Sequence, residues 1–174
     1  MALQNFQEEC AFIYLYEPMD FNFSVMCNLG AKKAGGEYLL LLNDDMEVLA
    51  DCADWLDRMV GQASLRHVGA VGAKLLYPNS TLIQHAGVTN TISGPGHKLK
   101  GLDDTQAYYY GRNKLVYDMI GVTAACLLIR TKVYRALGGL YEGLRVAYND
   151  VDLCFRLCEK GLCNVQRNDV VLDH

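Results

Sequence analysis

Short apolar runs alternate with segments of helical pattern along the first half of this chain. Residues 11–16, 38–42 and 68–76 are apolar runs, whereas 25–34 and the segment that starts at Asp51 have apolar residues at helical spacing. Apolar runs without alternation are typical of strands that are buried on both faces, as in parallel sheets covered by helices. The pattern therefore predicts an α/β fold with a mostly parallel central sheet.

The regular pattern is lost over residues 90–114, which are rich in Gly and Asp. A connection of this length inside a compact domain is typical of a flexible lid or binding loop. Six regions of regular structure are expected after it: strands at 115–120 and 124–129, a short helix that Thr131 caps and that ends at Gly138–Gly139, a helix at 150–160, and short strands at 163–167 and 170–172. We expect one domain over residues 1–174, with residues 1–10 as a leader or an artificial extension.

The composition narrows the function classes. The 174 residues are 51% hydrophobic and carry a formal net charge of −4, without a basic run that would bind a nucleic-acid backbone, so no nucleic-acid partner is expected. No apolar stretch approaches the ~20 residues of a membrane span, and the first residues do not resemble a signal peptide. We expect a cytoplasmic protein, held at the cytoplasmic face of the membrane if a longer parent carries an anchor.

The seven cysteines are an odd number and form no C-x-x-C pair. Cys154, Cys158 and Cys163 are the closest group, but a zinc site needs a fourth ligand and tighter spacing. Buried free thiols are the favoured interpretation.

Two adjacent carboxylates, Asp44 and Asp45, follow directly after the apolar run 38–42. Ligands of open α/β sheets bind beyond the carboxyl ends of the strands, which is where these acids are expected. Two neighbouring carboxylates repel each other unless a cation neutralises them, and Mg²⁺ or Mn²⁺ prefers such oxygen ligands and commonly brings phosphates. Response-regulator receivers and aspartate-nucleophile phosphatases share this pattern, and an Asp pair that only caps a turn is a further alternative.

A second acidic cluster lies at the start of the predicted helix 150–160. The helix dipole favours the ionised form of Asp150, and Asp152 is spaced to form an ion pair with Arg156. A capped helix with a surface salt bridge explains this segment alone. Together with Asp44 and Asp45, however, Asp150 is a candidate general base for an acceptor hydroxyl.

The order of several short motifs resembles the later two-thirds of family 2 glycosyltransferases, which have the GT-A fold. The motifs are Phe21–Ser24, Asn28–Gly30, Ala34–Tyr38, Leu42–Asp45, Val68–Leu76, Gln84–Gly87, Gly138–Gly139, Asn149–Cys154 with Arg156, and Leu172–His174. Each motif alone is weak, but the ordered set over about 150 residues is specific to the family.

By this resemblance, Asn43–Asp45 corresponds to the family's D-x-D motif, with Asn in its first position. Asp45 is then a direct metal ligand, Asp44 lies against the nucleotide ribose or the metal's waters, and Asn43 binds substrate beside them. His174 aligns with a histidine that joins the metal or the diphosphate in related enzymes. A terminal histidine without a role is the alternative.

The resemblance also assigns the acceptor side of the site. Asn149–Asp150 resembles the family's Glu-Asp motif and makes Asp150 the expected general base. Asp152 and Arg156 are expected to support it or to contact substrate. Thr123 lies in Gly121–Cys126, which resembles the acceptor-side segment, and is expected to bind substrate.

The resemblance implies an inverting, hexosyltransferase-type enzyme that uses Mg²⁺ or Mn²⁺. It would transfer a sugar from a nucleotide-diphospho-sugar donor to a saccharide or lipid-linked acceptor, in polysaccharide biosynthesis for the cell envelope. The family's first β-α units have no counterpart here, so we expect a fragment without activity that self-associates through the exposed sheet. A Mg²⁺-dependent phosphate enzyme or a non-catalytic carbohydrate-binding remnant remains the alternative.

Overall fold

The structure, a computed structural model, describes residues 12–174. Its strands are β1 (Tyr38–Leu42), β2 (Glu47–Val48), β3 (Val68–Leu76), β4 (Ile83–His85), β5 (Val88–Thr91), β6 (Gly94–His97), β7 (Val116–Met119), β8 (Cys126–Arg130) and β9 (Cys163–Asp173). Its helices are α2 (Phe23–Lys33), α3 (Trp55–Ala63), α4 (Thr131–Ala136) and α5 (Asn149–Glu159), with a 3₁₀ turn at Ala50–Cys52. The expected strand at 68–76 forms with the same bounds.

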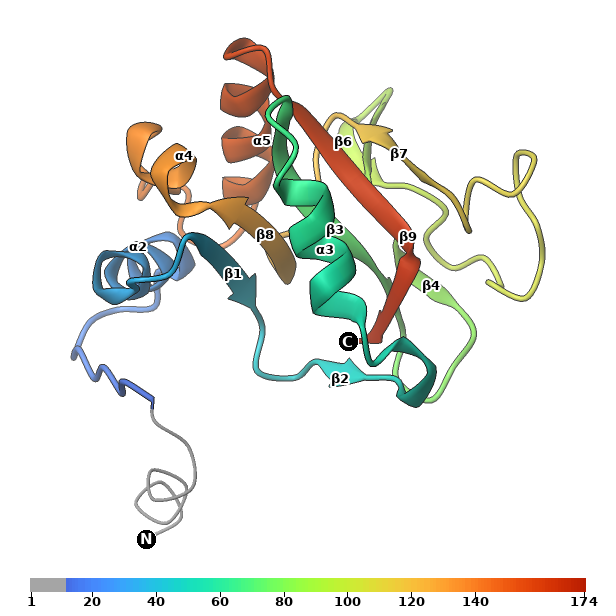
Figure 1. Cartoon of the computed structure of the whole chain (residues 1–174), viewed down its shortest axis with the longest axis horizontal. Helices are drawn as coiled ribbons and strands as arrows, with labels where there is room; N and C mark the ends of the chain where they lie inside the picture. The colour runs from blue at the N-terminus through green and yellow to red at the C-terminus, as the bar shows by residue number, and fades with distance from the viewer. Residues whose placement is uncertain (1–11) are drawn as a thin grey trace, which may run out of the picture.

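The elements are arranged as a central sheet with helices on both faces (Figure 1). The strand order is β1-β8-β3-β9-β2, with β4 added to β3 and β7 to β9. Helix α3 packs on one face, and α2, α4 and α5 pack on the other. Strands β5 and β6 form a separate hairpin. The predicted α/β class is confirmed.

The direction of neighbouring strands differs from the prediction of a mostly parallel sheet. Only β3 and β9 pair in parallel among the described strands, whereas the pairs β1–β8, β3–β8, β3–β4, β2–β9 and β7–β9 are antiparallel. The reason is that β8 lies between β1 and β3 and runs against both. Strands β1, β3 and β9 thus share one direction, but β8 is apolar on both faces like its neighbours, so its sequence does not reveal its reversal.

The strand expected at 11–16 is also wrong for the residues that the structure describes there. Residues 12–16 have no strand, and Ile13 and Tyr16 are exposed; Ala11 lies outside the described residues. An apolar run becomes a strand only where a neighbour supplies hydrogen bonds, and the outer edge of β1 is unpaired within residues 12–174. Self-association through this edge stays a prediction.

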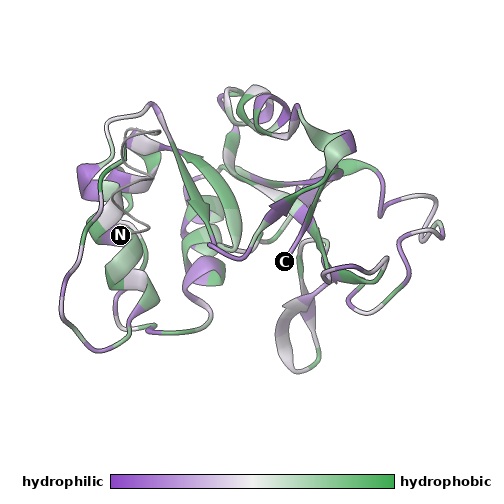
Figure 2. Cartoon of the chain, turned by 90° about the horizontal axis from the view of Figure 1, so that it is seen from below, coloured by the Kyte–Doolittle hydropathy of each residue, from purple (hydrophilic) through white to green (hydrophobic). Residues whose placement is uncertain are grey.

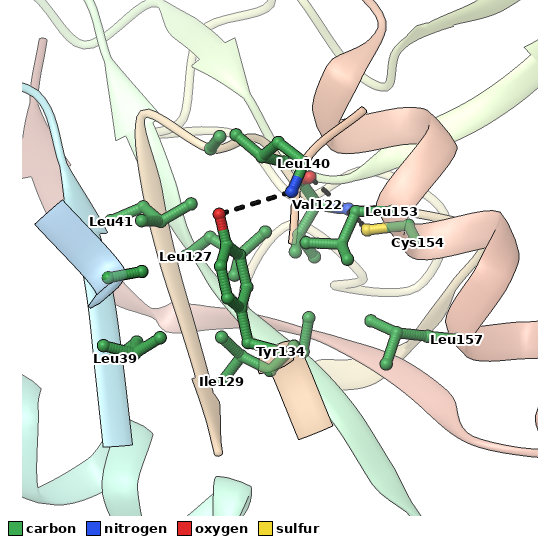
Figure 3. Close-up of a cluster of buried hydrophobic side chains, with 13 residues drawn as sticks. Leu39, Leu41, Val122, Leu127, Ile129, Tyr134, Leu140, Leu153, Cys154 and Leu157 are labelled. Carbon is green, nitrogen blue, oxygen red and sulfur yellow. Dashed lines mark hydrogen bonds between the residues drawn. The ribbon is translucent and has the colours of Figure 1, made fainter. Parts of the chain in front are cut away.

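Two large apolar clusters lie one on each face of the sheet, and a smaller third cluster is formed by Leu76, Ile83, Ala86 and Leu99. Strand β8 joins the two large clusters, because Leu127 and Ile129 point to the α5 side and Cys126 and Leu128 to the α3 side. Figure 3 shows the first cluster, in which Tyr134 of α4 faces the β1 and β8 side chains. In Figure 2, segments of the central strands are coloured green, which marks hydrophobic residues. The alternation along β8 is what a strand buried on both faces requires.

The expectation of buried free thiols is confirmed for only part of the described cysteines, because Cys158 is exposed and Cys27 and Cys163 are partly buried. Cys52, Cys126 and Cys154 are buried and free, and burial raises the pKa of the Cys126 and Cys154 thiols to about 12. Within the described chain, no helix is both long and apolar enough to cross a bilayer.

Helix α2 begins two residues earlier than the helical pattern over 25–34 indicates, and Asn22 is its N-cap. The Asn22 side chain accepts a hydrogen bond from the Val25 N–H at 3.1 Å. Ser24 is fully buried and its hydroxyl donates to the Leu144 carbonyl at 2.7 Å. The start of α2 is thereby attached to the segment that leads into α5.

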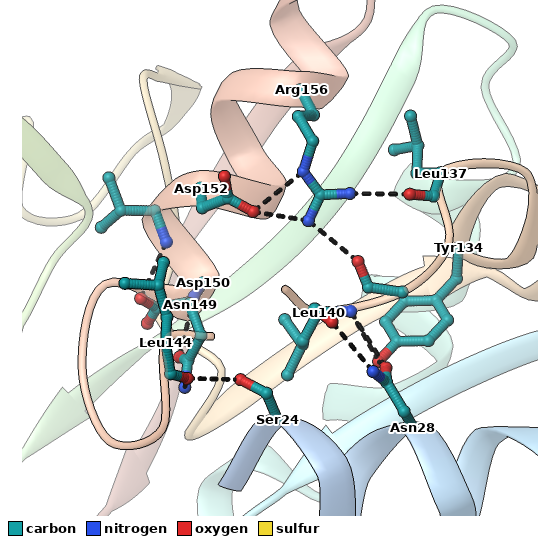
Figure 4. A network of polar contacts seen from close by, with 12 residues as sticks. Ser24, Asn28, Tyr134, Leu137, Leu140, Leu144, Asn149, Asp150, Asp152 and Arg156 are labelled. Atoms are coloured by element: carbon teal, nitrogen blue, oxygen red, sulfur yellow. Dashed lines mark hydrogen bonds and ion pairs between the residues drawn. The ribbon is translucent and has the colours of Figure 1, made fainter. Parts of the chain in front are cut away.

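Asn28 of α2 holds the turn after α4. Its Nδ2 donates to the Leu140 carbonyl, and its Oδ1 accepts from the Tyr134 hydroxyl and the Leu140 N–H (Figure 4). Gly139 passes beside this amide with φ +76°, a conformation that L side chains rarely adopt. Position 139 requires a glycine, because its φ angle is positive and because a side chain there would collide with Asn28.

Residues 90–114 contain more structure than the expected flexible loop. Their first part is in the β5–β6 hairpin, and Asp104 is buried against Lys74 of β3 at 2.7 Å. Lys74 also donates to the Asn113 carbonyl, and Lys114 pairs with the same Asp104 oxygen. Lys74 is fully buried but is a charged residue, so the hydrophobic pattern of the sequence did not indicate its contact with Asp104.

The pKa shifts of the pair have opposite physical causes. Burial lowers the pKa of the Lys74 ammonium, against the hydrogen bond and charge of Asp104. Burial alone would raise the pKa of the Asp104 carboxyl, but hydrogen bonds from Lys114, Lys74 and Asn113 outweigh it and hold that pKa below its usual value.

Gly139→Ala is expected to lower the free energy of unfolding by roughly 3 kcal/mol, the sum of a left-handed backbone cost and overpacking. Its Cβ would lie 2.2 Å from Asn28 Oδ1 and 3.0 Å from a Tyr134 ring carbon. Gly138→Ala is the matched control, since its φ is +78° and its Cβ would meet open space. It should cost only about 1 kcal/mol. Equal losses in urea denaturation would contradict the packing argument.

Asp104→Asn is expected to destabilise the chain by about 3–5 kcal/mol, because it leaves the buried Lys74 charge without a counter-ion. The double variant Lys74→Met/Asp104→Leu should recover most of this loss. Since folding lowers the pKa of Asp104, its contribution is present above the unfolded value of about 3.9 and is lost as pH falls through the lower folded value. Denaturant titrations across pH measure both effects; a double variant as unstable as Asp104→Asn would contradict the first.

Candidate functional site

The two acidic clusters are attached to neighbouring residues of one segment. After β1, the Asn43 N–H donates to the Ala125 carbonyl at 2.9 Å. The Ala124 N–H donates to Asp150 Oδ2 at 3.0 Å. Because β1 and β8 are antiparallel partners with Leu42 opposite Cys126, the end of β1 meets the start of β8 there. The structure thus brings the Asn43–Asp45 motif and Asp150 to the same end of the sheet.

Asp150 is held at the N-terminus of α5. Its Oδ1 accepts from the Val151 N–H at 2.8 Å, in addition to the contact of Oδ2 with Ala124. Tyr148, just before the helix, has φ +63° and ψ 2°, an uncommon backbone conformation of the kind that gathers at functional sites. Figure 4 shows Asp150 in this first turn. The carboxylate is half-buried and has a fixed orientation.

A pocket of about 330 Å³ opens beside Asp150. The β5–β6 hairpin lines one side with Pro95 and His97, and the segment that contains Tyr148 lines the other. Thr123 is half-buried in the turn before β8, and its Oγ1 accepts from the Ala125 N–H at 3.3 Å. This pocket is large enough for part of a small polar ligand next to a carboxylate.

The ring of His97 is supported by His85 of β4. Their Nδ1 atoms are 2.7 Å apart and the rings meet edge to face. Burial, together with the neighbouring His97, lowers the pKa of His85 to about 3, so its ring is neutral. Burial and the charge of Lys100 also lower the pKa of His97. His85, which lies in the motif Gln84–Gly87, thus braces a residue of the Asp150 pocket.

Asp45 and His174 lie on the other side of the Ala124–Ala125 segment from Asp150. His174 Nε2 is 3.2 Å from Asp45 Oδ1 and 3.0 Å from Asn43 Nδ2. Asp44 is exposed in the same turn. These contacts bring together two parts of the candidate site that are far apart in the sequence, since His174 lies 131 positions from Asn43.

The pair of Asp45 and His174 fits a divalent cation. Two neighbouring ligands of an octahedral ion, each about 2.1 Å from it, lie roughly 3 Å apart, close to the observed 3.2 Å. In the described part of the chain no cluster of three or more His, Cys, Asp or Glu is placed to hold a metal. Two protein ligands suit Mg²⁺ or Mn²⁺ sites that are completed by water and phosphate oxygens.

Asp152 and Arg156 have a structural arrangement. The Arg156 guanidinium pairs with Asp152 Oδ2 at 2.6 Å and donates to the carbonyls of Leu137 and Gly139, each at 2.8 Å (Figure 4). This ties α5 to the turn after α4 and so stabilises the start of α5. Both expected roles of Asp152 and Arg156, support of Asp150 and contact with substrate, stay predictions.

Gln84 is a residue of the site that the sequence reasoning missed. It had been noted only as part of a motif, yet both of its amide atoms contact His174. The two residues are 90 positions apart, so no spacing in the sequence indicates the contact. Only the β4–β3–β9 arrangement shows it.

Two curated relatives match most of the chain. It is 43% identical over 155 residues to the uncharacterized protein y4gI of Sinorhizobium fredii (strain NBRC 101917 / NGR234), covering 87% of the chain and 16% of that protein. It is 42% identical over 144 residues to the O-antigen biosynthesis protein RfbC of Myxococcus xanthus, covering 82% of the chain and 11% of that protein. The chain thus spans less than a fifth of the length of either relative. No family model matches it.

Two solved structures share the fold. The mannosyltransferase PcManGT of Pyrobaculum calidifontis, in complex with GDP-Man and Mn²⁺, matches 99% of this chain and 43% of its own, with a TM-score of 0.69 and 15% identity. GalNAc-T7 with UDP, GalNAc and Mn²⁺ matches 99% and 34%, with a TM-score of 0.74 and 11% identity. The chain has the GT-A glycosyltransferase fold, and together with the relative RfbC these findings support a glycosyltransferase domain.

Proposed function

We propose that this chain is the catalytic part of a metal-dependent, inverting glycosyltransferase of hexosyltransferase type. The observation that carries the proposal is the shared support of the two acidic clusters: Ala125 holds Asn43 of the metal motif, and Ala124 holds Asp150. The site thereby has a place for a donor phosphate next to a place for an acceptor hydroxyl. The complexes of the two structural neighbours with a nucleotide or nucleotide-sugar and Mn²⁺ agree with this.

On the donor side, Asp45 and His174 would hold Mg²⁺ or Mn²⁺, and Asn43 and Asp44 would contact the nucleotide. When bound, such an ion neutralises the charge that develops on a leaving diphosphate. Asp45 needs no rearrangement for this task, because its carboxylate already lies exposed beside the imidazole. His174 is fixed by contacts on both ring nitrogens.

On the acceptor side, Asp150 acts as the general base. It takes the proton of the acceptor hydroxyl while that oxygen forms a bond to the anomeric carbon. The bond from the anomeric carbon to the diphosphate oxygen breaks on the opposite face, and the nucleoside diphosphate leaves with the electron pair. A single displacement of this kind inverts the anomeric configuration. Thr123 and the pocket that contains His97 would hold the acceptor.

A saccharide or lipid-linked acceptor in cell-envelope polysaccharide synthesis is the setting that we favour, because RfbC is an O-antigen biosynthesis protein. The shared fold speaks for a transferase over a receiver or an aspartate-nucleophile phosphatase. A carbohydrate-binding remnant without turnover is the competing function, and a cytoplasmic location stays a prediction.

Asp150→Asn in the full-length protein is expected to lower the transfer rate by about 10²–10⁴-fold, because the general base is lost. Binding of donor and Mn²⁺ should be unchanged, since Asp45 and His174 are intact. Asp57→Asn, an exposed site on α3, is the matched control and should keep full activity. Radiolabelled sugar transfer measures the rate, and NMR of the product gives its anomeric configuration. Full activity of Asp150→Asn would overturn the assignment of the base.

The 174-residue chain alone is expected to bind UDP weakly and to show no turnover. The metal motif follows β1, whose outer edge is unpaired within residues 12–174, so the described chain supplies only one side of a nucleotide site. Isothermal titration with UDP and Mn²⁺ measures the affinity. A low-micromolar dissociation constant would contradict this expectation.

A further inference from the structure

The orientation of the Gln84 amide follows from one contact with the backbone. One of its terminal atoms lies 2.7 Å from the backbone oxygen of His174. That oxygen only accepts hydrogen bonds, so the atom that faces it is Nε2, which donates. The carbonyl Oε1 of Gln84 must then be the atom that lies 2.6 Å from His174 Nδ1.

The amide orientation fixes the tautomer of the His174 ring. Since Oε1 has no hydrogen to donate, Nδ1 of His174 must carry the proton of this short contact. In the neutral ring, Nε2 then has a free electron pair. Asn43 agrees with this assignment, because its Nδ2 is the atom that approaches Nε2, at 3.0 Å.

A carboxylate oxygen also lies near Nε2. Asp45 Oδ1 is 3.2 Å away, and a neutral nitrogen and a carboxylate oxygen at that distance repel unless a cation or a proton lies between them. Gln84 and His174 are neighbours because of the architecture: His174 N–H donates to the Leu76 carbonyl at the end of β3, and β4 pairs with the same end of β3. Gln84 thus reaches His174 across the last residue of β3.

We propose that Gln84 is a positioning residue that holds His174 in the Nδ1–H tautomer, with Nε2 directed at Asp45 as a ready ligand for Mn²⁺ or Mg²⁺. The inference rests on the metal site of the proposed function and adds to it a residue that touches neither metal nor substrate. Partners of this kind, when removed, typically reduce metal affinity by 10–100-fold. Gln84→Met, which keeps the size and removes both hydrogen bonds, should reduce the affinity for Mn²⁺ within that range.

The first experiment reads the tautomer in the chain without metal. Long-range ¹H–¹⁵N NMR of ¹⁵N-histidine-labelled protein, at alkaline pH where a free imidazole is neutral, identifies the protonated nitrogen. His174→Gln identifies the His174 signals. The wild type should carry the proton on Nδ1; a proton on Nε2 in the wild type would overturn the proposal without any Gln84 variant. In Gln84→Met a mixture of the two tautomers is expected, and an unchanged Nδ1–H form would also overturn it.

The second experiment measures Mn²⁺ alone, by the line broadening that it causes in the same spectra. Gln84→Met should need 10–100-fold more Mn²⁺ for the same broadening. Gln84→Glu should bind Mn²⁺ more nearly like the wild type than Gln84→Met does, because its carboxylate still accepts from Nδ1 although it no longer donates to the His174 oxygen. Gln62→Met, a partly exposed glutamine on α3, is the matched control and should change nothing.

Failure of the metal site and failure of the Gln84 positioning role give different results. If His174→Gln and Asp45→Asn leave Mn²⁺ broadening unchanged, the metal site is wrong and the proposed function loses its donor side. If these two variants abolish the broadening but Gln84→Met binds Mn²⁺ like the wild type, the metal site stands and the positioning role of Gln84 is wrong. If Gln84→Met does not fold, the wild-type tautomer and the Gln84→Glu affinity still decide the question.

Discussion

The site depends on two backbone hydrogen bonds made by adjacent residues. Ala125 receives the N–H of Asn43, and Ala124 gives its own N–H to Asp150. Both contacts exist because β8 lies between β1 and β3 and starts where β1 ends. The antiparallel strand β8, which departs from the expected sheet, is therefore preceded by the segment that contacts both the Asn43–Asp45 motif and Asp150.

The sequence predicted the features that follow from local residue patterns. It did not predict strand direction or contacts between residues far apart in the chain. The bounds of β3 and the position of Asp150 at the start of α5 followed from apolar runs and helix-start rules. The direction of β8 did not, because burial on both faces gives one pattern for either direction. The contact of Gln84 with His174 was equally hidden, since it spans three strands.

Strand β4 is short, but it serves both halves of the site because successive side chains of a strand point to opposite faces. Gln84 turns toward His174 on the donor side, and His85 turns toward His97 in the pocket of Asp150. Each contact fixes an imidazole by its Nδ1. A displacement of β4 along β3 would therefore disturb both imidazole contacts at once, because one backbone register positions Gln84 and His85 together.

The buried ammonium of Lys74 has a consequence for motion near the site. By holding Asp104 and the Asn113 carbonyl, it fastens the middle and the end of the connection between β6 and β7 to the rigid sheet. The connection then behaves as separate short spans instead of one long span. The loop-closure entropy of each short span is smaller than that of one long span, so the tyrosine-rich stretch between the two attachment points is restrained at both ends.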